Sequence, residues 1–176
     1  MNRLIEKQII IINGTGGSGK DTFVEFCMQY ANVMNFSSID KVKEIATIIG
    51  WNGKKTEKDR KFLSDLKKLT TEYNDMAFNS IKEAVDIFYN SDKEILFIHI
   101  REPEEVERAA FEFNAKTLLV KRDGLKNIET NYSDASVDNY NYDYIINNTT
   151  LEELDNCALN FVEGLKKNKQ LIKVKN

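Results

Sequence analysis

The chain has 176 residues, 41% of them hydrophobic and 30% charged, which favours one globular domain and excludes a disordered or membrane-embedded protein. The longest apolar runs, Ile9–Ile12 and Ile95–Ile98, are far shorter than the roughly 20 residues of a membrane span, and the charged N-terminus is unlike a signal peptide. A net charge of −3 argues against a nucleic-acid-binding surface. We therefore expect a cytoplasmic protein that binds neither membranes nor nucleic acid.

The apolar pattern predicts strands that alternate with amphipathic helices. Strands are expected at 8–13, 33–37, 94–100, 117–120 and 144–146. Helices are expected after the glycines of 14–19, from Asp40 to Gly50, over 56–90 as one long helix or two, from Pro103, and after the capping-box sequence that Thr150 begins. Because the strands are apolar throughout, they indicate a parallel sheet covered on both faces, an α/β three-layer sandwich.

The segment between the first strand and the first helix satisfies the phosphate-loop pattern G-x-x-x-x-G-K. It consists of Gly14, Thr15, Gly16, Gly17, Ser18, Gly19 and Lys20, and is followed by Asp21 and Thr22. In such a loop the backbone N–H groups and the helix N-terminus bind phosphate oxygens, and the lysine reaches the terminal phosphates of the nucleotide. The segment 14–22 therefore predicts an ATP site, with Lys20 as a catalytic residue.

One position of the loop departs from the pattern. Asp21 occupies the place where a serine or threonine usually ligates magnesium. A carboxylate beside phosphates is repelled unless a divalent cation lies between them, and Mg²⁺ accepts carboxylate ligands, so Asp21 is the candidate metal ligand. The alternative is that Asp21 caps the start of the helix.

The run Gly-Lys-Asp-Thr at 19–22 resembles the phosphate loop of phage-type deoxynucleoside monophosphate kinases and, more distantly, that of animal-type phosphomevalonate kinases. Two further segments, 98–105 and 142–148, resemble the strand-end Arg-x-x-x-Glu and the last strand of the same group. The resemblance implies a single P-loop kinase domain over 1–176 with the strand order 2-3-1-4-5. It also implies an acceptor-binding segment at about 40–90 and a lid at about 122–141.

The resemblance also implies roles for individual residues. Those expected to meet the phosphate or base of the acceptor are Asp40, Lys41, Trp51, Lys54, Lys55, Arg60 and Arg101. Arg101 follows a buried strand at the carboxyl edge of the sheet, where ligands of open α/β folds bind, and its planar fork suits a phosphate. The alternative for Arg101 is an ion pair with Glu105, four residues on.

In the resembled kinases the lid begins with cations that neutralise the transferring phosphoryl group. Here Lys121 and Arg122 are expected directly after the fourth strand, and Arg122 is the proposed catalytic cation, with Lys126 the other basic residue of the lid. The third strand contains no aspartate in the Walker-B place, and Glu102 is the nearest carboxylate beyond it. His99, inside this apolar strand, is expected to be a hydrogen-bonded core residue and not a catalyst.

These features predict Mg²⁺- and ATP-dependent phosphorylation of a small phosphate-bearing acceptor, first of all a (deoxy)nucleoside monophosphate. A phosphomevalonate-type kinase is the alternative enzyme. A nucleotide-binding regulator without turnover is the alternative from another class, which Asp21 and the missing strand-end acid favour. The identity of the acceptor and the oligomeric state stay open at this stage.

Overall fold

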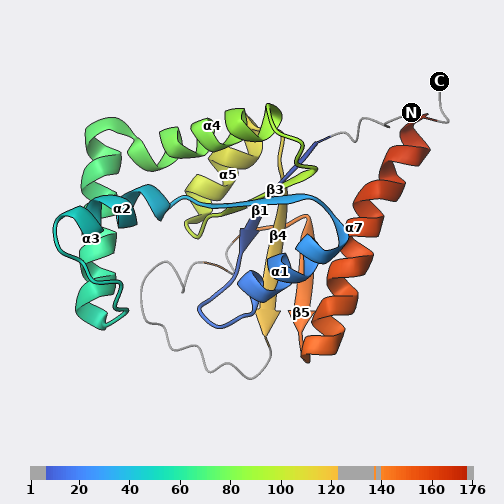
Figure 1. Ribbon diagram of the computed structural model, residues 1–176, viewed down its shortest axis with the longest axis horizontal. Coiled ribbons are helices and arrows are strands. Elements are labelled where there is room, and N and C mark those ends of the chain that lie inside the picture. Colours follow the sequence, from blue (N-terminus) through green and yellow to red (C-terminus); the bar gives the residue numbers. More distant parts are fainter. Residues whose placement is uncertain (1–6, 123–136, 138–139, 174–176) are drawn as a thin grey trace. The chain divides into compact units, whose positions relative to one another are not determined.

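The computed structural model describes residues 7–122, 137 and 140–173, with side chains described up to residue 167 (Figure 1). The strands are β1 Gln8–Asn13, β2 Val33–Ser37, β3 Ile95–His99, β4 Lys116–Arg122 and β5 Tyr144–Asn148. The helices are α1 Lys20–Tyr30, α2 Asp40–Ile48, α3 Glu57–Asn74, α4 Met76–Tyr89, α5 Pro103–Glu112 and α7 Leu151–Lys173. Strands and helices alternate as the apolar pattern predicts, and no helix within the described residues is both long and apolar enough to cross a bilayer.

The five strands form one parallel sheet in the order β2-β3-β1-β4-β5, which confirms the predicted fold class. The central strand β1 pairs with β3 on one side, where Ile10 lies opposite Phe97, and with β4 on the other, where Ile11 lies opposite Thr117. β1 and β3 are buried on both faces because helices cover the sheet on both sides, which explains their unbroken apolar runs.

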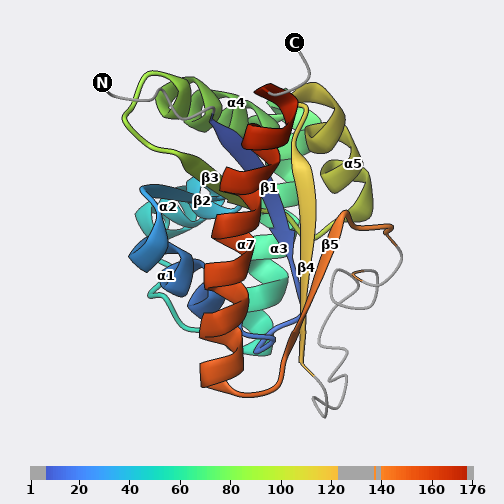
Figure 2. The same cartoon turned by 90° about the vertical axis from the view of Figure 1, so that its right-hand side faces the viewer.

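The chain divides into two compact units: unit 1 comprises Met1–Asn35 and Asp92–Asn176, and unit 2 comprises Phe36–Ser91. In unit 1, α1 and α7 contact each other over one face of the sheet, and α5 contacts β1 and β4 (Figure 2). The core beneath α1 and α7 is aromatic: the ring of Phe23 packs edge-on against those of Phe97 and Phe161, with centroids 6.4 and 5.7 Å apart. This core holds the strand–loop–helix segment of the phosphate loop.

Unit 2 consists of α2, α3 and α4, and it spans the segment 40–90 that is expected to bind the acceptor. The region 56–90 forms two helices because Asp75 adopts a left-handed conformation with φ of 54°. All residues of α3 are described, and none of them is fully buried. Several apolar side chains of α2 and α3 are exposed, among them Ile48, Leu69 and Tyr73 at 83%, 63% and 86%.

Several strand boundaries differ from the sequence prediction: β3 is one residue shorter at each end, β4 begins one residue earlier, and β5 continues to Asn148. β4 extends beyond Val120 to Arg122 because its last two residues pair with β5, Lys121 with Asn147 and Arg122 with Asn148. Lys121 and Arg122 therefore end the strand and do not follow it. The predicted lid at about 122–141 consists largely of residues 123–136, which include Lys126, and 138–139. These residues lie outside the described part of the chain.

Candidate functional site

The segment 14–19 connects β1 directly to α1, which is the context that a phosphate loop requires. Gly17 and Gly19 have φ of 81° and 93°, conformations that glycine adopts without strain, and Gly19 is the N-cap of α1. Inside the loop the amide of Ser18 donates to the carbonyl of Thr15 over 3.2 Å. The first amides of α1 have no partner within the helix and carry its partial positive charge, so this end of α1 favours an anion.

Glycine is also required at the two ends of the loop by close approach. A Cβ atom on Gly14 would lie 2.6 Å from the carbonyl oxygen of Val120, and one on Gly19 would collide with Nδ2 of Asn148. The hydroxyl of Ser18 is buried and has no hydrogen-bond partner among the described residues. A buried polar atom without a protein partner is uncommon, and this one lies inside the loop.

Two buried asparagines fix the loop to the sheet. Asn13, the last residue of β1, donates from Nδ2 to the carbonyl of Arg101 (2.9 Å) and to the hydroxyl of Tyr142 (2.8 Å), and its Oδ1 accepts from the amide of Gly14 (2.8 Å). Asn148, the last residue of β5, donates from Nδ2 to the carbonyl of Ser18 (2.9 Å). The loop is therefore held at both ends by side chains from the carboxyl edge of the sheet.

Sequence reasoning did not single out these two asparagines. The signal was partly present in the pattern, because each follows an apolar run: Asn13 comes directly after four isoleucines, and Asn148 is the second of two asparagines after Ile146. Both side chains are nearly inaccessible, with 0% exposure at Asn13 and 6% at Asn148, and each buried amide is hydrogen-bonded as buried polar groups require.

Asp21 contacts a histidine and does not cap its helix. The N-cap position belongs to Gly19 and no side-chain capping hydrogen bond forms there, but Asp21 does lie in the first turn of α1, where a negative charge is favourable. The Asp21 carboxylate is 77% exposed and its Oδ1 lies 3.5 Å from Nδ1 of His99. Nε2 of the same imidazole lies 2.8 Å from Oδ1 of Asn35 in β2.

The expectation that His99 is hydrogen-bonded is confirmed, but its place differs from the strand interior. His99 is the last residue of β3, with its side chain 11% exposed, at the carboxyl edge of the sheet. It lies opposite Ile12 in the register of β1 and β3, two residues before the loop begins. Sequence spacing carries no signal for a contact among residues 21, 35 and 99, because only the sheet brings them together.

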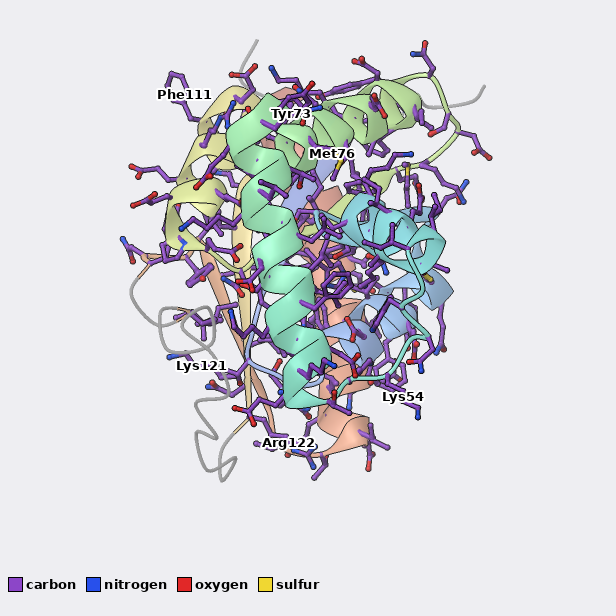
Figure 3. All side chains as sticks on the ribbon, turned by 90° about the vertical axis from the view of Figure 1, so that its left-hand side faces the viewer. Lys54, Tyr73, Met76, Phe111, Lys121 and Arg122 are labelled. Atoms are coloured by element: carbon purple, nitrogen blue, oxygen red, sulfur yellow. The ribbon has the colours of Figure 1, made fainter. Side chains whose placement is uncertain are left out.

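The cations expected to act with the loop also lie at the carboxyl ends of strands in unit 1. Arg101 follows β3 and is half-buried, with its backbone carbonyl held by Asn13. Lys121 and Arg122 end β4, and Figure 3 shows both side chains there; Arg122 is the exposed one. Because the carboxyl ends of parallel strands meet at one edge, these residues share that edge with the loop and Lys20.

The other predicted acceptor residues lie in unit 2 and contact local partners. The Asp40 carboxylate accepts from the amide of Ser37 (3.1 Å) and pairs with Lys43 (3.2 Å), and Lys41 pairs with Glu44 over 2.9 Å. The indole Nε1 of Trp51 donates to the carbonyl of Lys54 over 3.0 Å, and Arg60 is exposed near the start of α3, as is Lys55 in the segment before it. Their role in acceptor binding stays a prediction.

Solved structures with the same fold show where the chain stands among known proteins. It matches the crystal structure of TT1252 from Thermus thermophilus with a TM-score of 0.53 and 17% identity, covering 90% of this chain and 97% of that one. It matches the shikimate kinase of Aquifex aeolicus with a TM-score of 0.54 and 11% identity, covering 89% and 97%. No protein-family model and no curated protein sequence matches. At these identities the likeness establishes the fold alone, an α/β sandwich on a five-stranded parallel sheet in the order 2-3-1-4-5.

Proposed function

We propose that this chain is a phosphotransferase that binds ATP with Mg²⁺ at the loop 14–22 and phosphorylates a small acceptor that itself carries a phosphate. A (deoxy)nucleoside monophosphate, which would become the diphosphate, is the proposed acceptor. The observation that carries the proposal is the phosphate loop, with its glycines, Lys20 and anchored ends, between β1 and α1. The fold shared with a shikimate kinase, an enzyme of phosphoryl transfer to a small molecule by its name, supports it.

The residues at the loop fit a magnesium ion. Mg²⁺ is usually held by one or two carboxylates together with substrate phosphates and water, and not by a cage of protein ligands. Asp21 offers an exposed carboxylate in the first turn of α1, where the phosphates would lie. Among the described residues no group of three or more His, Cys, Asp or Glu side chains forms such a cage. When bound, the ion would be held by Asp21 and would supply positive charge that offsets the negative charge of the phosphates.

In the proposed step an oxygen of the acceptor phosphate forms a bond to the γ-phosphorus of ATP, and the bond from that phosphorus to the bridging oxygen breaks. The loop amides and Lys20 hold the β- and γ-phosphates and stabilise the charge that develops on them. Arg101 would hold the acceptor phosphate through its planar fork, and Arg122 would neutralise the phosphoryl group in transfer. Catalysis then depends on positioning and charge, which requires no strong base.

A phosphomevalonate-type acceptor remains the alternative substrate, since it too presents a phosphate oxygen as nucleophile. A nucleotide-binding regulator without turnover is the second candidate function. It is favoured by a specific observation: Asp21 stands in the place of the usual hydroxyl, and the strand end that usually supplies an acid carries His99.

The test is an assay of ADP release with ATP, Mg²⁺ and a panel of acceptors that contains the nucleoside and deoxynucleoside monophosphates and phosphomevalonate. Release that depends on one monophosphate supports the proposal and identifies the acceptor. Tight Mg²⁺–nucleotide binding with no acceptor-dependent release would favour the regulator. Absence of nucleotide binding would reject both functions.

A further inference from the structure

We propose that His99 is a positioning residue that holds the carboxylate of Asp21 at the mouth of the phosphate loop. The inference rests on the proposed function, because a positioned carboxylate matters most if the loop binds Mg²⁺ with a nucleotide. It starts from the contact of His99 Nδ1 with Asp21 Oδ1 at 3.5 Å and of His99 Nε2 with Asn35 Oδ1 at 2.8 Å.

The three side chains differ in how firmly they are held. The His99 imidazole is 11% exposed, ends the buried strand β3, and is bound on its Nε2 side by Asn35. The Asp21 carboxylate is 77% exposed and would by itself sample several rotamers. Because the ring is fixed and presents Nδ1 to the Asp21 carboxylate, it reduces the number of rotamers that Asp21 samples. Side chains that hydrogen-bond to metal ligands orient those ligands in this way.

The contact requires a proton on Nδ1, which then faces a carboxylate that can only accept. If the ring carries both protons, the carboxamide oxygen of Asn35, 2.8 Å away, accepts from Nε2–H. After a half-turn of the carboxamide, its NH₂ group would instead donate to Nε2 of a neutral ring. Asn35 therefore supports the ring in either charge state while Nδ1 points to Asp21.

The arrangement also accounts for the missing strand-end acid. In P-loop nucleotide hydrolases a loop Ser or Thr and an aspartate that follows a strand usually hold the magnesium ion. Here the acid stands on the loop, at Asp21, and the end of the neighbouring strand supplies an imidazole that contacts it. A hydroxyl is fixed by its short side chain, whereas a carboxylate needs a partner to fix its direction, and His99 is placed to be that partner.

The first experiment uses the fact that His99 is the only histidine of the chain. Long-range ¹H–¹⁵N spectra of the labelled protein, at one pH and without metal or nucleotide, report directly on the protonation of Nδ1. We expect a protonated Nδ1 in the wild type and a clear change of its ¹⁵N shift in Asp21→Asn. Identical ring signals in the two proteins would overturn the contact and with it the inference. This readout is independent of any nucleotide binding.

The second experiment compares two amide replacements in titrations of Mg²⁺ against binding of a non-hydrolysable ATP analogue. The amide nitrogen of His99→Asn lies near the position of Nδ1 and keeps a donor toward Asp21, whereas the longer side chain of His99→Gln reaches toward Asn35 and loses that donor. We expect the Mg²⁺ concentration that half-saturates analogue binding to stay within about twofold of wild type in His99→Asn and to rise about tenfold in His99→Gln. Tenfold is the lower end of the loss in metal affinity when a residue that hydrogen-bonds to a metal ligand is removed.

Thermal melts of both variants check that each one is folded. The inference would be overturned if both variants had the wild-type Mg²⁺ requirement, if both lost Mg²⁺ affinity equally, or if His99→Asn lost more. In each case the donor that faces Asp21 would not be what sets the Mg²⁺ affinity. A wild-type protein that binds no nucleotide in the presence of Mg²⁺ would reject the proposed function, while the ring spectra would still decide whether His99 holds Asp21.

Discussion

Phe23 in unit 1 is fully buried against two aromatic rings, whereas Tyr73 in unit 2 is 86% exposed. The difference extends to the polar contacts. In unit 1, buried asparagine side chains hydrogen-bond to residues at the ends of the phosphate loop. Unit 2 contains exposed ion pairs such as that of Lys61 with Asp65. Exposed pairs contribute little, typically about 0–1 kcal/mol. The proposed donor site thus lies on a buried aromatic core, whereas α3, in the segment expected to bind the acceptor, has no buried residue.

The largest expected difference between the units is in stability. Phe23→Ala should lower the free energy of unfolding by about 3–5 kcal/mol, because it empties a packed aromatic site. Tyr73→Ala should change it by less than about 0.5 kcal/mol. Urea unfolding followed by circular dichroism measures both. Trp51, the only tryptophan, lies in unit 2, so its fluorescence shows whether that unit unfolds together with unit 1. Equal effects of the two substitutions would contradict the comparison.

Lys20→Ala should leave the fold intact and lower kcat/KM by at least about 150-fold, which corresponds to about 3 kcal/mol of transition-state stabilisation lost with a positioned cation. The matched control is Lys61→Ala, an exposed lysine of α3 that pairs with Asp65 and should keep wild-type kinetics. Steady-state ADP release at saturating acceptor provides the measurement. Near-normal turnover of a folded Lys20→Ala protein would remove the phosphate loop from the proposed mechanism.

The acceptor site can be assigned to one unit by two conservative substitutions. Arg101→Lys in unit 1 keeps the charge and loses the planar fork, so we expect the acceptor KM to rise about tenfold, about 1.4 kcal/mol, with ATP affinity unchanged. Arg60→Lys in unit 2 is the partner experiment. If only Arg60→Lys raises the acceptor KM, the acceptor phosphate binds in unit 2. A lower melting temperature of Arg101→Lys without kinetic change would make Arg101 the ion-pair partner of Glu105.

Helix caps offer a smaller and better matched comparison, because each unit has a helix that begins with threonine. The Thr56 hydroxyl in unit 2 accepts from the amide of Asp59 (3.2 Å), and the Asp59 carboxylate accepts from the amide of Thr56 (3.0 Å). Thr150 in unit 1 accepts from the amide of Glu153 (3.2 Å). Alanine at either position should cost about 1 kcal/mol in urea unfolding, and serine should restore most of it. Trp51 fluorescence should respond more to the cap of unit 2.

The smallest effect is expected in the pH dependence of stability. Burial of Asp143 would raise its pKa, but hydrogen bonds from the amide and hydroxyl of Thr117 (2.8 and 2.9 Å) and the charge of Lys116 outweigh it, so the pKa is lowered. A lowered pKa in the folded state contributes stability above the unfolded value of about 3.9, and this contribution is lost as pH falls through the folded pKa. Asp143→Asn should therefore flatten the stability profile below about pH 4 and leave its shape unchanged at neutral pH. An unchanged acid limb in urea unfolding would contradict this assignment.

The strands, the helices and the phosphate loop follow from the sequence because their signals are local. An apolar run marks a buried strand, glycines mark the loop between β1 and α1, and Thr150 marks the start of α7. The same local reasoning placed the end of β4 two residues early, since the polar residues Lys121 and Arg122 extend the strand only through their pairing with β5. Helical spacing also predicts an apolar face and not what covers it: in unit 2 the apolar residues Ile81, Val85 and Phe88 of α4 are buried, whereas α3 has no buried residue.

The tertiary structure decided the contacts that fix the site. The sequence by itself determined that a loop with the phosphate-loop pattern leads into the first helix and that an acid, Asp21, follows its lysine. Only the folded sheet brings Asn13 to Tyr142 and Asn148 to Ser18, pairs separated by 129 and 130 residues. The same holds for His99 at the end of β3, which contacts Asp21 in the first turn of α1. The physical reason is that strand order and register place residues that are distant in sequence at one carboxyl edge, and no short-range pattern encodes that placement.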